Sequence, residues 1–481
     1  MKFRYRIGAA LLALLLLFSL LVACAPEEDD APPPVTSLPH PSDVTAPPTT
    51  APPVTAAPPT SPPATEALPP TLITPPTDDE LYGMVARVDL EKLSLVQTYY
   101  FFHYVGEFRE VTECLYEIYE LLRTVEGVAE ITDPEQATAL FIDAYARTLG
   151  DYYGYYYPAE DYDDYIDDMG GEYTGIGVSV TLTESGYAEI LTVFSSSPAE
   201  DAGLLPGDLL VEVEGEDFAA IGYQEAINRI RGIEGTTVCV TVLRDGQRIS
   251  VTMPRRRVVE ETVTYKMLAG GIGYIRITSF DAETYTQFVT AHRALDEAGA
   301  SSFVFDVRNN PGGTLTSVLA ILEYILPDGV IVKMNYKVDE NDASFSSIYD
   351  YDPTYMSGRT YYENHRITEP MVVLANGRTA SAGELFTSSL QDYGVAEVIG
   401  ERTYGKGIGQ TAIGFGDGSG FVFTVFYYDP PTSPNYHGVG IAPDSAVALP
   451  EAAEQKNIYK LTYEEDTQLQ AAVGALTSAQ P

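Results

Sequence analysis

The stretch Phe303-Val-Phe-Asp-Val-Arg-Asn-Asn-Pro-Gly-Gly313 sets the fold of this 481-residue chain. Its first five residues are apolar apart from one aspartate, a run that is typical of a strand buried on both faces of a parallel sheet. The glycine-containing turn behind this run leads to a helix that we expect to begin near Thr316. A strand that feeds a helix through a short turn is the unit from which parallel sheets are built.

The same strand-to-helix pattern recurs on both sides of this stretch. We expect strands at 272–277, 371–375 and 395–399, with helices over 284–298 and from 380 to about 390. Repeated strand–helix–strand units predict a largely parallel sheet with right-handed crossovers. The sequence therefore predicts an α/β core over 259–450, within a chain that is α+β overall.

Two of the expected strand-to-helix turns contain candidate catalytic groups. The carboxyl ends of parallel strands share one edge of the sheet, where sites usually form. Ser381 stands at the start of the helix that follows Ala375, and free backbone N–H groups at a helix start suit an oxyanion. The turn Gly312-Gly313 offers further donors, because glycine permits close approach of a substrate. This arrangement indicates a serine nucleophile at Ser381.

A serine nucleophile needs a base, and Lys406 is the candidate. It lies between two glycines ahead of an apolar run, and burial away from acids lowers a lysine pKa from its usual ~10.4. Ser–Lys pairs are a known variant of the serine triad, and Gln410 is placed to hold the amine. Three alternatives stay open: Ser381 as a simple helix cap, Lys406 as a surface lysine, and His437 as the base.

A smaller, mostly β domain is predicted over 171–258. Short β-like runs fill this region, and Asp245-Gly246 is a strong hairpin signal. Gly175-Ile-Gly-Val178 resembles the carboxylate-binding loop of a PDZ domain, and Ser197-Pro-Ala199 with Ala202-Gly203-Leu-Leu-Pro-Gly-Asp208 resembles the segment before the central strand of bacterial PDZ modules. Such a loop turns backbone N–H groups towards a terminal carboxylate, and the peptide adds as a strand. The predicted peptide-binding residues are Gly175, Ile176, Gly177 and Val178.

The N-terminus has the features of an export signal. A basic start and an uncharged apolar run precede Cys24, which predicts a signal peptide at 1–23. The end of the run resembles the lipobox of bacterial lipoproteins, which implies lipid on Cys24; an uncleaved membrane anchor is the alternative. The Pro/Thr-rich stretch 24–77 is expected to be an extended linker. We expect a protein outside the cytoplasm, anchored to a bacterial cell membrane, with a helical region at 78–170 and a C-terminal tail at 451–481.

The composition argues against several other functions. The formal net charge of −41 would repel nucleic acid and anionic lipid. Cys114 and Cys239 are too few, after Cys24, for a disulfide framework or a cysteine-based metal site. The five histidines are scattered, so the sequence predicts neither a metal nor a cofactor.

The whole arrangement resembles the carboxy-terminal processing (tail-specific) proteases, a serine peptidase family with a crotonase-like core. Asp306-Val-Arg-Asn-Asn-Pro-Gly-Gly313, Ala380-Ser-Ala-Gly-Glu384, Gly400-Glu-Arg-Thr-Tyr-Gly-Lys-Gly407 and Gly438-Val-Gly-Ile-Ala-Pro-Asp444 carry the resemblance. It implies Ser381 as nucleophile, Lys406 as base, Gln410 as its orienting residue, and Ala382, Gly312 and Gly313 as the oxyanion hole. Arg378-Thr379 and Gly383 depart from the family pattern without removing a catalytic group.

The function predicted from these features is that of a membrane-anchored serine endopeptidase. Its partners would be protein or peptide substrates with accessible, apolar C-termini, bound through the PDZ domain. The first alternative is a catalytically silent PDZ scaffold or chaperone for exported proteins. A crotonase-like acyl-CoA enzyme is disfavoured, because acyl-CoA substrates are cytoplasmic. The sequence does not decide the oligomeric state.

Overall fold

The computed structural model describes residues 78–170, 172–183, 185–327, 329–337, 348–350, 367–454 and 456–478. The predicted signal peptide at 1–23, the lipidation site Cys24 and the linker that follows it lie outside the described residues. Within the part of the chain that is described, every helix is too short or too polar to cross a membrane.

A six-stranded sheet forms the centre of the C-terminal half, with strand order β10-β11-β12-β15-β16-β19. The strands span Val263–Leu268 (β10), Ile272–Ile277 (β11), Ser302–Asp306 (β12), Met371–Ala375 (β15), Ala396–Gly400 (β16) and Ser445–Ala446 (β19). Neighbours from β11 to β19 are parallel, and only β10 is antiparallel to its neighbour. Every residue of β11, β12 and β15 is buried. The predicted parallel sheet, covered on both faces, is thus confirmed.

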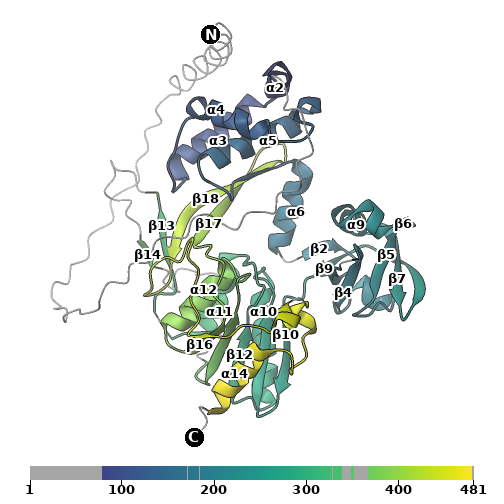
Figure 1. Ribbon diagram of the computed structural model, residues 1–481, viewed down its shortest axis with the longest axis vertical. Coiled ribbons are helices and arrows are strands. Elements are labelled where there is room, and N and C mark those ends of the chain that lie inside the picture. The colour runs from purple at the N-terminus through teal and green to yellow at the C-terminus, as the bar shows by residue number, and fades with distance from the viewer. Residues whose placement is uncertain are drawn as a thin grey trace, which may run out of the picture. The chain divides into compact units, whose positions relative to one another are not determined.

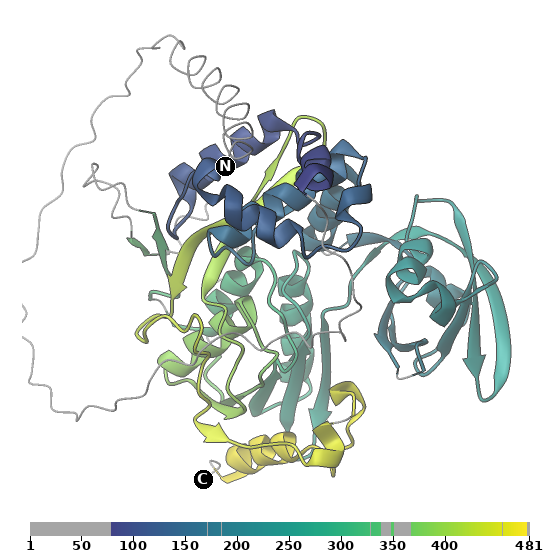
Figure 2. The same cartoon turned by 45° about the horizontal axis from the view of Figure 1, so that its top comes forward.

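Helices cover both faces of this sheet (Figures 1 and 2). They span Thr284–Glu297 (α10), Leu315–Ile325 (α11), Ala382–Asp392 (α12) and Thr467–Ser478 (α14). Phe303 and Phe305 of β12 pack in one cluster with α10, α11 and α12, whereas Val304 packs in another with Leu469 and Leu476 of α14. The segment that the sequence predicts only as a tail therefore covers one face of the sheet; α13 (Glu451–Glu454) and η3 (Ile458–Lys460) precede α14.

An antiparallel sheet joins the N-terminal region to this core. Its strands are Tyr155–Tyr157 (β1), Lys333–Tyr336 (β13), Ile348–Asp350 (β14), Ile408–Gly414 (β17) and Gly420–Asp429 (β18). β18 is central, because β1, β13 and β17 all pair with it. The helices predicted ahead of it are present as Asp78–Val85 (α2), Leu90–His103 (α3), Val111–Leu122 (α4), η1 (Val128–Glu130), Pro134–Thr148 (α5) and Ala159–Gly170 (α6). The elements from α2 to α5 share one hydrophobic cluster with the C-terminal half.

A small β domain is inserted between α6 and β10 and has its own hydrophobic core. Its strands are Glu172–Gly175 (β2), Val178–Leu182 (β3), Ala188–Val193 (β4), Leu209–Val213 (β5), Glu216–Asp217 (β6), Thr237–Arg244 (β7), Gln247–Pro254 (β8) and Arg256–Val259 (β9), and its helices are Pro198–Asp201 (α7), Phe218–Ile221 (α8) and Tyr223–Ile230 (α9). The predicted hairpin joins β7 to β8. Asp245 and Gly246 both have positive φ there, as a tight hairpin turn requires.

Candidate active site

Ser381 lies in the turn between β15 and α12, immediately before the helix begins. Its φ of 54° and ψ of −120° are unusual for a residue other than glycine. Such a conformation costs about 1–3 kcal/mol and persists only where neighbouring contacts impose it. Here the Ser381 amide donates to Oε2 of Glu384 at 3.0 Å, and the Ala380 amide donates to the Asn310 carbonyl at 2.9 Å. The sharp turn places Ser381 on the wall of a cleft.

The predicted oxyanion turn lies directly against Ser381. A Cβ atom at Gly312 would stand 2.7 Å from Cβ of Ser381 and 3.0 Å from the Ala382 nitrogen, so only glycine fits. The Gly312 amide already donates to Oδ1 of Asn310, at 2.8 Å. Among the residues that the structure describes, the amides of Gly313 and Ala382 have no hydrogen-bond partner. These two N–H groups are open to a substrate carbonyl.

Lys406 lies between β16 and β17 and lines the same cleft as Ser381. Burial lowers the pKa of Lys406 to about 8, although the charges of Asp151 and Glu384 act to raise it. About half of the amine is therefore neutral near pH 8 and able to accept a proton. In the described structure no hydrogen bond joins the Lys406 amine to Oγ of Ser381; contacts of this kind commonly tighten only when substrate binds.

The Glu384 carboxylate connects the loops that carry Ser381 and Lys406. It accepts four hydrogen bonds: from the amide of Ser381 at 3.0 Å, from the amides of Gly405 and Lys406 at 2.7 Å each, and from Oγ1 of Thr403 at 2.5 Å. Its side chain is fully buried, and burial raises the pKa of Glu384 while these hydrogen bonds oppose the rise. One side chain thus fixes the backbone on both sides of the cleft.

Gln410, the predicted orienting residue, also lines the cleft. Its side-chain amide donates to Oγ1 of Thr424 at 3.3 Å. Thr424 in turn donates to the buried carboxylate of Asp151 through its hydroxyl, at 2.8 Å, and through its amide, at 3.0 Å. No hydrogen bond between Gln410 and Lys406 occurs in the described part of the chain, so this role of Gln410 stays a prediction.

His437, the alternative base, is not among the residues that line the cleft. Burial and the nearby charge of Lys406 lower the pKa of His437. Its ring packs edge-on against Tyr427, with ring centres 5.9 Å apart, and its amide donates to Oδ1 of Asn435 at 2.7 Å. The geometry therefore favours Lys406 over His437 as the base.

The cleft has a volume of about 480 Å³, and most of its remaining wall is aromatic or aliphatic. The Tyr428 hydroxyl donates to the Lys406 carbonyl at 2.8 Å and lies 3.4 Å from Oγ of Ser381. The ring of Tyr153 faces the Lys406 amine. Sequence reasoning missed both tyrosines. Tyr153 belongs to a tyrosine-rich segment at 152–157 whose simplest interpretation is packing, and Tyr428 is one of several aromatic residues in an apolar strand.

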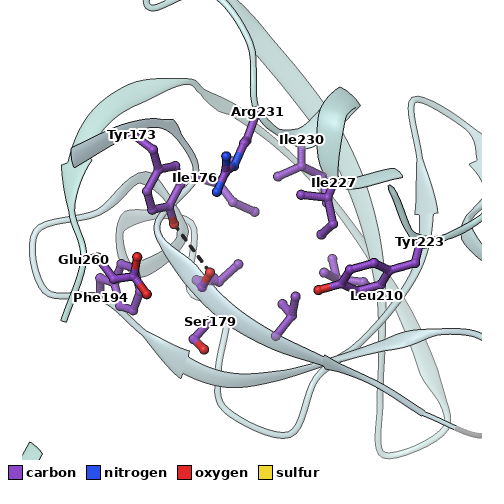
Figure 3. Close-up of a pocket in the computed structure, with 12 residues that line it drawn as sticks. Tyr173, Ile176, Ser179, Phe194, Leu210, Tyr223, Ile227, Ile230, Arg231 and Glu260 are labelled. Carbon is purple, nitrogen blue, oxygen red and sulfur yellow. Dashed lines mark hydrogen bonds between the residues drawn. The ribbon is translucent and has the colours of Figure 1, made fainter. Parts of the chain in front are cut away.

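A second hollow lies in the β domain, between β3 and α9 (Figure 3), with a volume of about 220 Å³. Ile176 and Val178, both predicted to bind peptide, line it opposite Tyr223 and Ile227 of α9. Gly175 and Gly177 shape the loop instead: Gly177 has a φ of 79°, and its carbonyl accepts from the Phe194 amide at 3.0 Å. Ile227 and Ile230 give the groove an apolar wall on its helix side. That it receives a final apolar side chain stays a prediction.

Comparison with known proteins identifies the class of protein to which this chain belongs. The model of Peptidase family S41 matches residues 271–447, and the model of the PDZ domain matches residues 174–254. The chain is therefore a serine-type protease that carries a PDZ domain.

Comparison with individual relatives identifies the family more narrowly. It is 32% identical to the carboxyl-terminal-processing protease of Synechocystis sp. over 64% of this chain and 69% of that protein. It is 32% identical to the enzyme of the same name from Picosynechococcus sp., over 71% of this chain and 78% of that one. It belongs to the carboxyl-terminal processing protease family. Among solved structures, a photosystem II D1 C-terminal processing protease aligns at 23% identity with a TM-score of 0.42, over 78% of this chain and 95% of that one.

Proposed function

We propose that this protease is an endopeptidase that works outside the cytoplasm, tethered to a bacterial membrane by lipid on Cys24. It binds the C-terminal tails of protein substrates in its PDZ groove and cleaves them with Ser381 and Lys406. The observation that carries the proposal is the grouping of Ser381 and Lys406 in one cleft, beside the open amides of Gly313 and Ala382.

The reaction follows from the positions of these groups. Neutral Lys406 takes the hydroxyl proton of Ser381 while Oγ attacks the scissile carbonyl carbon. The amides of Gly313 and Ala382 donate to the oxygen that becomes negative in the tetrahedral intermediate. Lys406 then gives its proton to the leaving amine, and water releases the new carboxyl terminus from the acyl-enzyme. The test is cleavage of an unfolded protein by the full chain and by variants at Ser381 and Lys406.

Tail recognition is assigned to the groove between β3 and α9. Replacing Ile227 with aspartate should weaken binding of a peptide with an apolar C-terminal residue at least about tenfold, because a charge would replace part of the half-buried apolar wall and would lose water when the peptide binds. The measurement is fluorescence anisotropy of a labelled peptide with a free C-terminus. Ile233→Asp is the matched control, because Ile233 belongs to the same domain and is 79% exposed. Equal affinity of the parent and Ile227→Asp for the peptide would show that this groove is not the binding site for substrate tails.

Membrane attachment rests on the sequence around Cys24. The protein expressed in its bacterial host is expected in the membrane fraction, and Cys24→Ala is expected to shift most of it to the soluble fraction, because one thiol would carry the lipid. Cell fractionation shows where the protein is located, and intact-mass measurement shows whether it carries lipid. Cys239→Ala is the control, since Cys239 lies in the PDZ domain. A Cys24→Ala protein that stays in the membrane, with a mass that differs from the parent's only by the substitution itself, favours an uncleaved anchor.

A further inference from the structure

The amine of Lys406 lies over the face of an aromatic ring. Its Nζ atom is 4.4 Å from the centre of the Tyr153 ring, well inside the range of a cation–π contact. Among the described residues, no carboxylate lies within ion-pair distance of this amine. The ring is thus the direct electrostatic partner of the Lys406 ammonium group in the cleft.

Tyr153 is held in place from the core rather than from its own loop alone. Its amide donates to Oδ1 of Asp151 at 3.2 Å. Asp151 is buried and also accepts from Thr424 of β18 and, at 3.2 Å, from the hydroxyl of Tyr100 of α3. The loop that carries Tyr153 is therefore fixed to β18, which runs beside the strand that follows Lys406.

The phenol of Tyr153 stays neutral wherever the enzyme works. Burial, and then the neighbouring hydroxyl of Tyr404, raise the pKa of Tyr153 well above its usual value. A neutral aromatic ring presents a negative face, which attracts an ammonium group and does not attract a neutral amine in the same way. The ring therefore acts selectively on the protonated form of Lys406.

We propose that Tyr153 is a positioning residue for the base of the reaction, and that its ring face holds the Lys406 ammonium group in the cleft beside Ser381. This inference rests on the proposed Ser381–Lys406 chemistry. Burial alone would drive the proton off Lys406 and leave a long, flexible side chain without an anchor. The ring restores part of the stability of the charged form, and it keeps the amine where Ser381 and the leaving group need it.

Other titratable groups also face Lys406. The carboxylates of Asp151 and Glu384 act through space to raise its pKa, and the charge of Lys406 acts on His437. Tyr428 contacts the Lys406 carbonyl. A test of the ring must leave these four groups unchanged, so it should alter the charge distribution of the Tyr153 ring while keeping its shape.

The experiment compares two rings of nearly equal shape in the full chain. Residue 153 is replaced by phenylalanine and, separately, by 3,4,5-trifluorophenylalanine, in which fluorine removes the negative face. The rate at which a fluorophosphonate labels Ser381 is measured from about pH 6 to pH 10, because labelling needs the neutral base and no peptide substrate. The parent acid limb is expected near pH 8, the value at which Lys406 loses its proton.

For Tyr153→Phe, the midpoint of the acid limb is expected at nearly the same pH as in the parent. For the trifluoro variant, the midpoint is expected about half a pH unit lower, because the protonated Lys406 amine has lost its aromatic partner. The same pair of substitutions at Tyr116, which is 68% exposed on α4, should leave the profile unchanged. Identical acid limbs for the two rings at 153 would overturn the inference while the proposed chemistry stood. Absence of labelling at Ser381 in the parent would overturn the proposed chemistry, and the inference with it.

Discussion

Replacing Ser381 or Lys406 with alanine is expected to lower the rate of cleavage of an unfolded protein by ~10³-fold or more. Ser381→Ala removes the atom that attacks, and Lys406→Ala removes the group that takes its proton. The two losses should not add, because the residues act as one unit, so the double variant should be about as slow as either single variant. The measurement is kcat/KM on a labelled unfolded protein with an apolar C-terminus.

Matched controls exist for both substitutions. Ser185 is an exposed serine of the PDZ domain, and Lys456 is a surface lysine paired with Glu465; alanine at either site should leave kcat/KM within about twofold, since surface substitutions are usually nearly neutral. If the parent and both active-site variants bind the tail equally and none cleaves it, the scaffold alternative gains. If Lys406→Ala keeps most of the activity, another group is the base, and His437 is the next residue to replace.

The sequence predicted where Ser381 lies in the fold because the information for that position is local. A buried strand, a short turn and a helix start place Ser381 at the carboxyl edge of the sheet, and the same logic places Gly312 and Gly313 across from it. The structure adds the strained φ of Ser381, which no residue pattern predicts, because neighbouring hydrogen bonds impose it.

The rest of the site depends on contacts between distant parts of the chain. Thr424 bonds Asp151 across a separation of 273 residues, and this contact places Tyr153 next to Lys406. A single sequence contains a tyrosine-rich segment and a polar threonine in an apolar strand, but no signal that they meet. Tertiary packing alone brings these two segments together, and packing between residues so far apart in the sequence cannot be derived from hydrophobic periodicity.

The ion pairs of the C-terminal segment could not be predicted from the sequence either. Arg308, which begins the turn after β12, is fully buried between Asp306 and Asp466 and pairs with both. The charges of Arg308 and Arg276 outweigh burial and hold the pKa of Asp306 far below its usual range. Asp466 lies in the segment that the sequence predicts only as a C-terminal tail. The buried arginine requires that partner, because an unpaired charge there would be costly, and so the segment docks beneath the turn that supplies the Gly313 amide.

Replacing Glu384 with glutamine is expected to lower kcat by about 10²-fold or more, with a smaller change in KM. All four groups that reach the Glu384 carboxylate are donors, and a glutamine side chain can present only one oxygen to them. Its NH2 group would face donors that it cannot satisfy, and a buried unsatisfied group costs about 1–3 kcal/mol. The backbone of Ser381 and of Lys406 would lose its common anchor, and displacements of the order of 1 Å between catalytic groups slow reactions about 10²-fold.

Glu113→Gln is the matched control for this substitution, because it separates the role of Glu384 in joining the loops of Ser381 and Lys406 from ordinary helix capping. Glu113 occupies the same helix position in α4, where its side chain accepts from the Glu110 amide at 3.2 Å, but it is exposed and does not line the cleft. Glutamine serves in a capping box about as well as glutamate, so Glu113→Gln should leave both stability and kcat within error. The discriminating readouts are the thermal midpoint and kcat measured on the same preparations. A Glu384→Gln enzyme that is folded and slow supports the role of Glu384 in joining the two loops, because its defect then lies in the alignment of Ser381 and Lys406. One that is folded and as fast as the parent would show that the turn at Ser381 holds its strained shape without the carboxylate.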